Sequence, residues 1–459
     1  MKKIKYGIIF MLIALGFSSC LTYYQVNADF YSNFESGRFL DAEKAMLKDK
    51  KGPNGRNKLL YYLNLGTATS LMGQYERSND YFEQAYIITD DYVKNYLAEA
   101  ASILINPNIA PYKGEDFELL YLHYYKALNY LKMNQPENAL VECRRMNIRL
   151  NTLSDRYKEQ SNKFRRDAFI HLLMGIIYEA NQEINNAFIA YRNALEIYEE
   201  DYKEMFDLEI PQQLKYDVIR TAHAMGFEDD VIRYEEKYNI HYTPDKDAAE
   251  KGTLIFLWHN GLGPIKTETT IDFSLSKGDT EVTFSNSDLG MVFSFEHDNM
   301  DDLKDLNSLT VAFPQYIERP PLFKQGEILW KNQYYPLELG ENMNRLAFKS
   351  LQQRMWQEMS KALLRLALRE AAEAALRSKD KGAAALFDIV SSFTVRADTR
   401  AWQAIPHSIY YRRIPMSEGE QKISFIAKTT NGSAKKYDFS FSMSAQKTIF
   451  HTFHSLESD

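Results

Sequence analysis

The N-terminal half repeats small and aromatic residues in a fixed order, and this repeat constrains the fold more than any other feature of the chain. The clearest copy consists of Gly66, Tyr75, Phe82 and Ala85. A second clear copy consists of Gly175, Tyr178, Ala187, Tyr191 and Ala194. Two antiparallel helices approach closely only where small side chains face each other, and aromatic side chains fill the wider ends. Each copy therefore predicts a pair of antiparallel helices joined by a turn.

The spacing resembles that of the tetratricopeptide repeat, in which such helix pairs stack in tandem. A weaker copy has Ala127 and Ala139, and the earliest copy, around Phe30, matches poorly. The first small positions of the four copies are separated by 36, 61 and 48 residues. Only the first gap is near the ~34 residues of a tandem repeat. The longer gaps must therefore hold extra helices or loops, and a half-unit is expected over residues 214–239.

The resemblance implies an all-α solenoid over residues 20–247 with a concave groove. Such grooves bind peptides or protein segments in related folds, although the fold alone does not establish binding. The alternative is an irregular helical bundle in which the small residues recur by chance. Both interpretations give an all-α region.

The N-terminus begins with a basic stretch and continues with an apolar run that is too short to span a bilayer permanently. The run ends at Phe17-Ser18-Ser19-Cys20, which resembles the lipobox of bacterial lipoproteins. The resemblance implies that residues 1–19 are a signal peptide and that Cys20 is lipidated. An ordinary signal peptide with a chance cysteine is the alternative. Leu21 and Thr22 follow Cys20, and the absence of Asp at the next position favours the outer membrane by analogy with enteric lipoproteins. No acidic run follows the cysteine, which favours the periplasmic face.

Charge and cysteine content exclude several classes of function. The net charge is −7, and removal of the signal peptide brings it near −10, which argues against a nucleic-acid partner. Cys143 is the only cysteine besides Cys20, so the mature chain forms neither an internal disulfide nor a cysteine-based zinc site. We expect Cys143 to be a buried structural thiol and expect no cofactor.

The C-terminal half, residues 252–459, changes to short apolar or alternating runs bounded by turn residues. Strands are expected over residues 253–258, 269–275, 281–284, 291–295, 308–313, 328–337, 408–413, 421–429, 436–443 and 447–453. A long helix is expected over 342–378 and a shorter one over 383–395. Charged residues interrupt the apolar run of the long helix, so it is not expected to span a membrane. A core helix is favoured over one lying on a membrane surface. The expected fold class is α+β, with mainly antiparallel strands following the helical region.

Two polar clusters are the candidate sites of this half. One contains Asn260, Gly261, Pro264 and Lys266, and the other contains Asp398, Arg400 and Trp402. With His259 and His407, Asp398 could act in acid–base chemistry. Alternatively, Asp398 and Arg400 form a charge-assisted brace, and Asn260-Gly261 is turn chemistry. His451 and His454 are three residues apart and would point to opposite faces of a strand, so we expect no metal site there.

These same clusters, with Ala312-Phe313-Pro314 and Ile405-Pro406, resemble motifs of a poorly characterised family of bacterial lipoproteins. Its members join a tetratricopeptide-like region to a mixed C-terminal domain. The resemblance implies architecture and localisation, and it carries over no activity.

The leading hypothesis is a non-enzymatic, membrane-anchored scaffold that binds a protein in the cell envelope. The lipid bilayer would be its second partner, through the N-terminal anchor. The alternative is an envelope enzyme, or an activator of one, that acts on cell-wall polymer or glycan through the C-terminal domain. That alternative requires Asp398, Arg400 and His259 to line one solvent-open pocket, with Trp258, Trp330 or Trp402 exposed to stack on sugar.

Overall fold

The computed structural model describes residues 22–94, 110–156, 166–278, 281–296, 308–379 and 397–458. The lipidation site expected at Cys20 and the helix expected over 383–395 lie outside these ranges. Among the described residues, no helix is both long enough and apolar enough to cross a bilayer.

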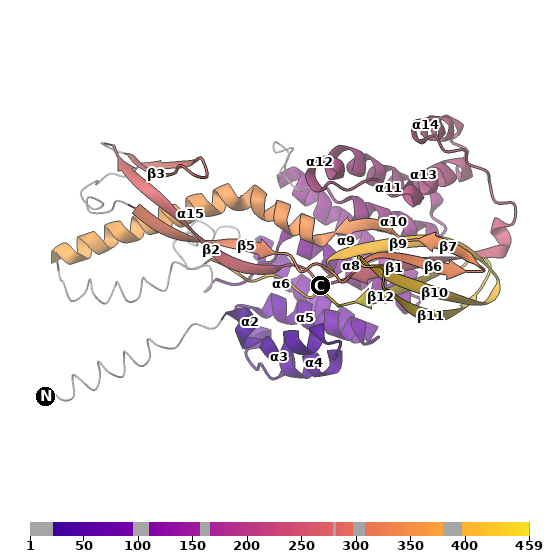
Figure 1. Cartoon of the computed structure of the whole chain (residues 1–459), viewed down its shortest axis with the longest axis horizontal. Helices are drawn as coiled ribbons and strands as arrows, with labels where there is room; N and C mark the ends of the chain where they lie inside the picture. Colours follow the sequence, from indigo (N-terminus) through magenta and orange to yellow (C-terminus); the bar gives the residue numbers. More distant parts are fainter. Residues whose placement is uncertain are drawn as a thin grey trace.

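The described N-terminal half is helical (Figure 1). Its elements are α2 (Tyr23–Val26), α3 (Ala28–Glu35), α4 (Phe39–Leu47), η1 (Gly52–Asn54), α5 (Lys58–Leu71), α6 (Tyr75–Lys94), α8 (Asp116–Lys132), α9 (Pro136–Arg156), α10 (Ala168–Ala180), α11 (Ile184–Ile197), η3 (Tyr198–Tyr202), α12 (Lys203–Phe206), α13 (Gln212–Ala224) and α14 (Glu228–Tyr238). A short turn, η4 (Ala248–Glu250), precedes the first strand. The pairs α3–α4, α5–α6, α8–α9, α10–α11 and α13–α14 pack against each other.

One backbone position recurs in the turn of all five pairs. Its residue adopts a positive φ: Gly37 (72°), Gly73 (75°), Asn134 (55°), Gln182 (62°) and Gly226 (72°). A left-handed residue ends the first helix of a pair and reverses the chain. These positions are spaced as the sequence copies are, so the helical region is TPR-like with irregular insertions. The expected half-unit after residue 214 is a complete pair, α13–α14.

The small positions of the two clear copies are set by close approach of an aromatic ring. A Cβ added to Gly66 would lie 2.8 Å from the Phe82 ring, and one added to Gly175 would lie closer still to Tyr191. The alanines of the copies (Ala85, Ala127, Ala139, Ala187 and Ala194) are fully buried. Tyr75 and Tyr178 are partly exposed. Cys143 is buried in α9.

Two four-stranded sheets form a sandwich beside the helices. The first has the order β12 (Thr448–Ser455), β1 (Lys251–Asn260), β9 (Ser408–Ser417), β8 (Glu338–Asn342). The second has the order β11 (Ala434–Met443), β10 (Gly419–Thr429), β6 (Phe323–Trp330), β7 (Gln333–Pro336). β1 and β12 are parallel, and the other neighbours in these sheets are antiparallel.

Strand β1 is buried on both faces. Leu254, Phe256 and Trp258 enter the core between the two sheets, whereas Ile255 and Leu257 join the core of the helical region. A strand covered on both faces needs no polar alternation, which explains the continuous apolar run. The helices and the first sheet therefore share one hydrophobic core.

The third sheet projects from this body together with a long helix (Figure 1). Its order is β4 (Met291–Glu296), β3 (Glu281–Asn286), β2 (Ile265–Lys277), β5 (Ser308–Ile317). Helix α15 (Met343–Lys379) packs on it, with Met359 and Leu363 against Phe273 and Phe313. Its first turns, at Met343 and Leu346, belong to the main core.

Several strands differ in their limits from the prediction, among them β2 and β9, which are longer than expected. The run 328–337 is a hairpin of β6 and β7, because Lys331 and Asn332 both adopt positive φ (47° and 61°) and reverse the chain. Pro314 does not end β5, which continues to Ile317. β5 lies at a sheet edge, where a missing N–H is tolerated.

Candidate functional site

The first helices of the central repeat units, which would line a concave groove, are covered by the C-terminal half. Every residue from Phe117 to Asn129 of α8 is buried, and α5 is buried along most of its length. A helix buried all round lies inside a core. The concave face predicted to receive a partner is therefore occupied by the chain itself.

Trp402 is the centre of this cover. Its side chain is 1% exposed, and its ring centroid lies 6.0 Å from that of Phe82 and 5.7 Å from that of Tyr125. The indole Nε1 donates to Thr67 Oγ1 (3.2 Å), and the backbone N–H donates to Glu118 Oε1 (2.7 Å). The Trp402 side chain thus fills the groove of the helical repeat, where the side chain of a bound partner would otherwise lie.

Arg400 fixes the same segment through ion pairing. Its Nε and Nη2 donate to the two carboxylate oxygens of Asp398 (2.8 and 2.7 Å). Its Nη1 donates to Asn57 Oδ1 (3.0 Å) and to the carbonyl of Ala110 (2.9 Å). The bidentate pair makes the brace expected from the sequence, and it extends across to the helical region.

Lys266 lies in a second buried polar contact. Its Nζ lies 2.9 Å from Glu115 Oε1, and Arg354 Nη2 lies 2.5 Å from Glu115 Oε2. Burial raises the pKa of Glu115, but the two cations outweigh it and lower that pKa to about 2. Burial and the charge of Glu115 raise the pKa of the neighbouring Glu118 to about 7. The interface thus contains an ionised Glu115 paired with two cations, next to Glu118, whose raised pKa favours its neutral form.

The Asn260 cluster supports the end of β1. Asn260 Nδ2 donates to the carbonyl of Phe323 (2.7 Å), and its Oδ1 accepts from Ser455 (2.9 Å). Gly261 has φ +67°, and its N–H donates to the carbonyl of Ser455 (2.7 Å). Pro264 is buried. These contacts are turn and packing chemistry.

Asp398, Arg400 and His259 do not line a solvent-open pocket. His259 is 1% exposed, with Nε2 2.5 Å from the Tyr124 hydroxyl and Nδ1 3.2 Å from His454 Nδ1. Burial lowers the pKa of His259 to about 3, so the ring is neutral at pH 7. Trp258 and Trp402 are also buried, and Trp330 is partly buried. The arrangement required of a glycan-acting enzyme at these residues is therefore absent.

His451 and His454 lie on opposite faces of β12. His451 packs against Phe439 and Phe441 in the sandwich, while His454 points to the helices, as their spacing predicted. Over the described ranges, no group of three or more His, Cys, Asp or Glu side chains could hold a metal ion.

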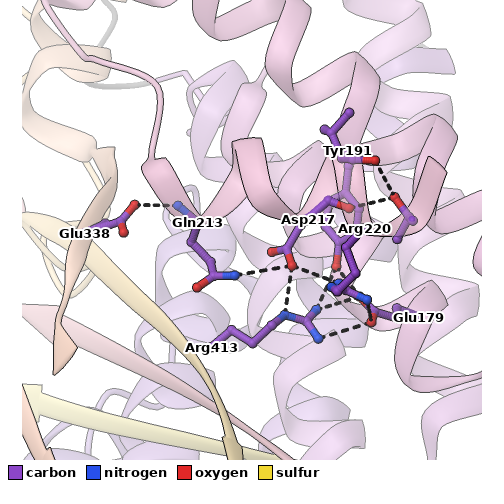
Figure 2. Close-up of polar contacts among 9 residues, drawn as sticks. Glu179, Tyr191, Gln213, Asp217, Arg220, Glu338 and Arg413 are labelled. Atoms are coloured by element: carbon purple, nitrogen blue, oxygen red, sulfur yellow. Dashed lines mark hydrogen bonds and ion pairs between the residues drawn. The ribbon is translucent and has the colours of Figure 1, made fainter. Parts of the chain in front are cut away.

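Sequence reasoning missed the ion network that joins α10, α13 and β9 (Figure 2). Arg413 Nη2 donates to Glu179 Oε2 (2.6 Å) and to the Tyr191 hydroxyl (2.9 Å), and its Nε lies 3.2 Å from Asp217 Oδ1. Arg220 donates to the same two carboxylates. Burial opposes ionisation, but Arg220 and Arg413 lower the pKa of Glu179 to about 2. The network locks the helices to the sheet.

An open hollow lies on the solvent side of the helical region, between α6 and α9. Its volume is about 300 Å³, and charged and amide side chains line most of it. Sequence reasoning did not identify it, because its residues come from two repeat units and follow no motif.

No protein-family model matches the chain, and no curated protein does. Similar solved structures include MamA (16% identical, covering 45% of this chain and 90% of that one, TM-score 0.29). They also include the apo form of RapI (16%, 50% and 57%, TM-score 0.34). A third is a kinesin light chain from Podosopora anserina with nearly identical TPR-like repeats (13%, 46% and 91%, TM-score 0.30). At TM-scores this low we conclude nothing about function from them. The TPR-like description rests on the helix pairs and turn positions of this chain.

Proposed function

We propose that this chain is a lipid-anchored scaffold of the bacterial cell envelope that binds a protein partner through the outer surface of its helical region. The observation that carries the proposal is the covered concave face. The groove of the TPR-like region holds the chain's own Trp402. The surface that remains for a partner is therefore that of the second helices of the repeat units, α6, α9 and α11. We therefore assign the partner site to the outer face of the helical region and no longer to the concave groove expected from the sequence.

The anchor is supported by the sequence alone. Phe17-Ser18-Ser19-Cys20 fits a lipobox. The residues after Cys20, which lack both an Asp at the next position and an acidic run, favour the periplasmic face of the outer membrane. The full chain is acidic, with a net charge of −7, and the body without the signal peptide is more acidic still, which favours a basic partner.

Fractionation tests the anchor. In cells given labelled palmitate, wild-type protein should be labelled and should sediment with membranes. Cys20→Ser should be unlabelled, and it should either remain unprocessed or leave the membrane fraction. Cys143→Ser is the matched control, since that thiol is buried in α9. A palmitate-labelled, membrane-bound Cys20→Ser protein would contradict the anchor.

A further inference from the structure

The hollow between α6 and α9 has a fixed, charged floor. Lys126 is 1% exposed, and its Nζ pairs with Glu83 and lies 2.9 Å from Glu142 Oε1. Arg145 Nη1 lies 3.0 Å from Glu83 Oε2 and 3.1 Å from Glu142 Oε1. His123 Nδ1 lies 2.7 Å from Glu142 Oε2. Two carboxylates are thus held in place by two cations and an imidazole.

Burying these charged side chains costs free energy of folding unless each one stays paired with an opposite charge. Burial alone would raise the pKa of Glu142, but His123 and Lys126 keep it below its usual value. The Glu142 carboxylate is therefore ionised at neutral pH. Since both cations are already neutralised by carboxylates, the floor does not attract an anionic ligand such as phosphate.

Two further polar side chains line the hollow and make no ion pair or hydrogen bond with these charged groups. Asp80 is exposed, and within the described ranges its carboxylate has no ion-pair or hydrogen-bond partner. Asn79 is only 6% exposed; its Oδ1 accepts from Asn129 (2.9 Å). Its Nδ2 has no acceptor at hydrogen-bonding geometry, and the Tyr130 hydroxyl is its polar neighbour. The Nδ2 atom is itself buried, so the group that the hollow offers to a ligand is the exposed carboxylate of Asp80.

The remaining wall is partly apolar. Val141 is 40% exposed, and the partly exposed Tyr130 also lines the hollow. Long basic side chains lay their aliphatic stems along such surfaces while the charged head reaches a carboxylate. The volume, about 300 Å³, suits one or two side chains with their backbone.

We propose that this hollow binds an extended peptide segment that carries a lysine or arginine. The basic head pairs with Asp80 and the exposed edge of Glu83. The aliphatic stem packs on Val141. The inference rests on the proposed scaffold function and names its binding site and the chemistry of its partner.

Binding to peptide pools tests the site. The probes are fluorescently labelled, end-capped seven-residue pools with central Lys or Arg, central Glu or central Gln, titrated into full-length purified protein. The Lys and Arg pools should bind more tightly than the Gln pool, and binding should weaken with salt. Asp80→Asn should weaken it about threefold to fivefold, as loss of an exposed charge pair does. Asp80→Lys should weaken it by about tenfold or more, and Asp80→Glu should restore it.

Asp229→Lys, on an exposed carboxylate of α14, is the matched control and should leave binding unchanged. Equal binding of the Lys and Glu pools, no binding of any pool, or wild-type affinity in Asp80→Lys would overturn the proposal. Failure of this binding site is distinguishable from failure of the proposed scaffold function. If a partner captured in cells crosslinks elsewhere on the helical region and Asp80→Lys retains it, only the hollow is wrong.

Discussion

The backbone N–H of Trp402 donates a 2.7 Å hydrogen bond to Glu118, and this contact joins the segment before β9 to the first helix of the third repeat unit. The residues are 284 positions apart in the chain. The segment fills the face that a solenoid would otherwise present to a partner. The C-terminal half is therefore the occupant of the groove, and this relation decides where a partner can bind.

Removal of the Trp402 side chain should destabilise the whole body. We expect Trp402→Ala to lower the free energy of unfolding by about 3–5 kcal/mol, because it leaves a cavity between Phe82 and Tyr125. Trp402→Phe should cost less, since only part of the volume and the Thr67 hydrogen bond are lost. Urea unfolding followed by circular dichroism measures both. Trp356→Ala, at a position 53% exposed, is the comparison and should cost about 1 kcal/mol or less. Equal effects at the two tryptophans would contradict the buried position of Trp402.

Close packing at Gly175 should make an added methyl group unfavourable. Gly175→Ala would press on the Tyr191 ring, and overpacking of this kind costs about 1–3 kcal/mol. At Gly278 the nearest atom to an added Cβ lies 3.5 Å away, so Gly278→Ala should change stability by less than ~0.5 kcal/mol. Thermal unfolding of the two variants, compared with wild type, decides whether the small position is a steric requirement.

The Arg413–Glu179 pair should be strongly coupled. Arg413→Met leaves Glu179 and Asp217 with Arg220 as their remaining cation, and loss of one partner from a buried pair costs about 3–5 kcal/mol. A double-mutant cycle with Glu179→Gln should give a coupling energy of about 1 kcal/mol or more. Arg233→Ala removes an exposed pair with Asp230 and should cost less than ~1 kcal/mol. Additive single effects at Arg413 and Glu179 would show that the pair does not hold the interface.

Stability should fall as the pH rises through neutrality. Burial raises the pKa of Asp167 to about 7, and burial with the charge of Asp167 also raises the pKa of Glu341. A raised pKa favours the protonated folded state, so this contribution is fully present below about pH 4 and is lost as the pH rises through about 7. Three pKa units correspond to roughly 4 kcal/mol at most.

Asp167→Asn isolates that effect. The amide oxygen can still accept from the Ile170 N–H at the start of α10, so the helix cap is retained while the titration is removed. Denaturant unfolding between pH 5 and 8 should show a shallower decline than in wild type. Below about pH 4.5 both proteins should lose stability, because Glu115 and Glu179, with pKa values near 2, become protonated. An unchanged decline in Asp167→Asn would assign the pH dependence to other groups.

Local spacing was enough to predict the helix pairs and most strands. Gly66 and Gly175 mark close helix approach, and the run of β1 marks a strand buried on both sides. The hairpin at Lys331-Asn332 was missed, because neither residue is the glycine that usually signals such a turn.

The interface could not be predicted from local spacing. Arg413 and Glu179 are 234 residues apart, and a charged residue in a strand or helix gives no indication of its partner. The same holds for Asp80 and Val141, which line one hollow because α6 and α9 both pack on α8. Arg400 and Trp402 were identified as notable residues, but only the structure shows that they hold the helices to the sheet.

Crosslinking mass spectrometry on intact cells tests the scaffold most directly, with reagents that couple carboxylates as well as amines. We predict that a second protein is crosslinked to wild-type chain at solvent-facing residues of α6 and α9, with no contacts to the buried face of α8, and that Asp80→Lys reduces its recovery. If the helical region yields only crosslinks within the chain itself, the protein does not act as a scaffold through its repeats, and the central claim is wrong.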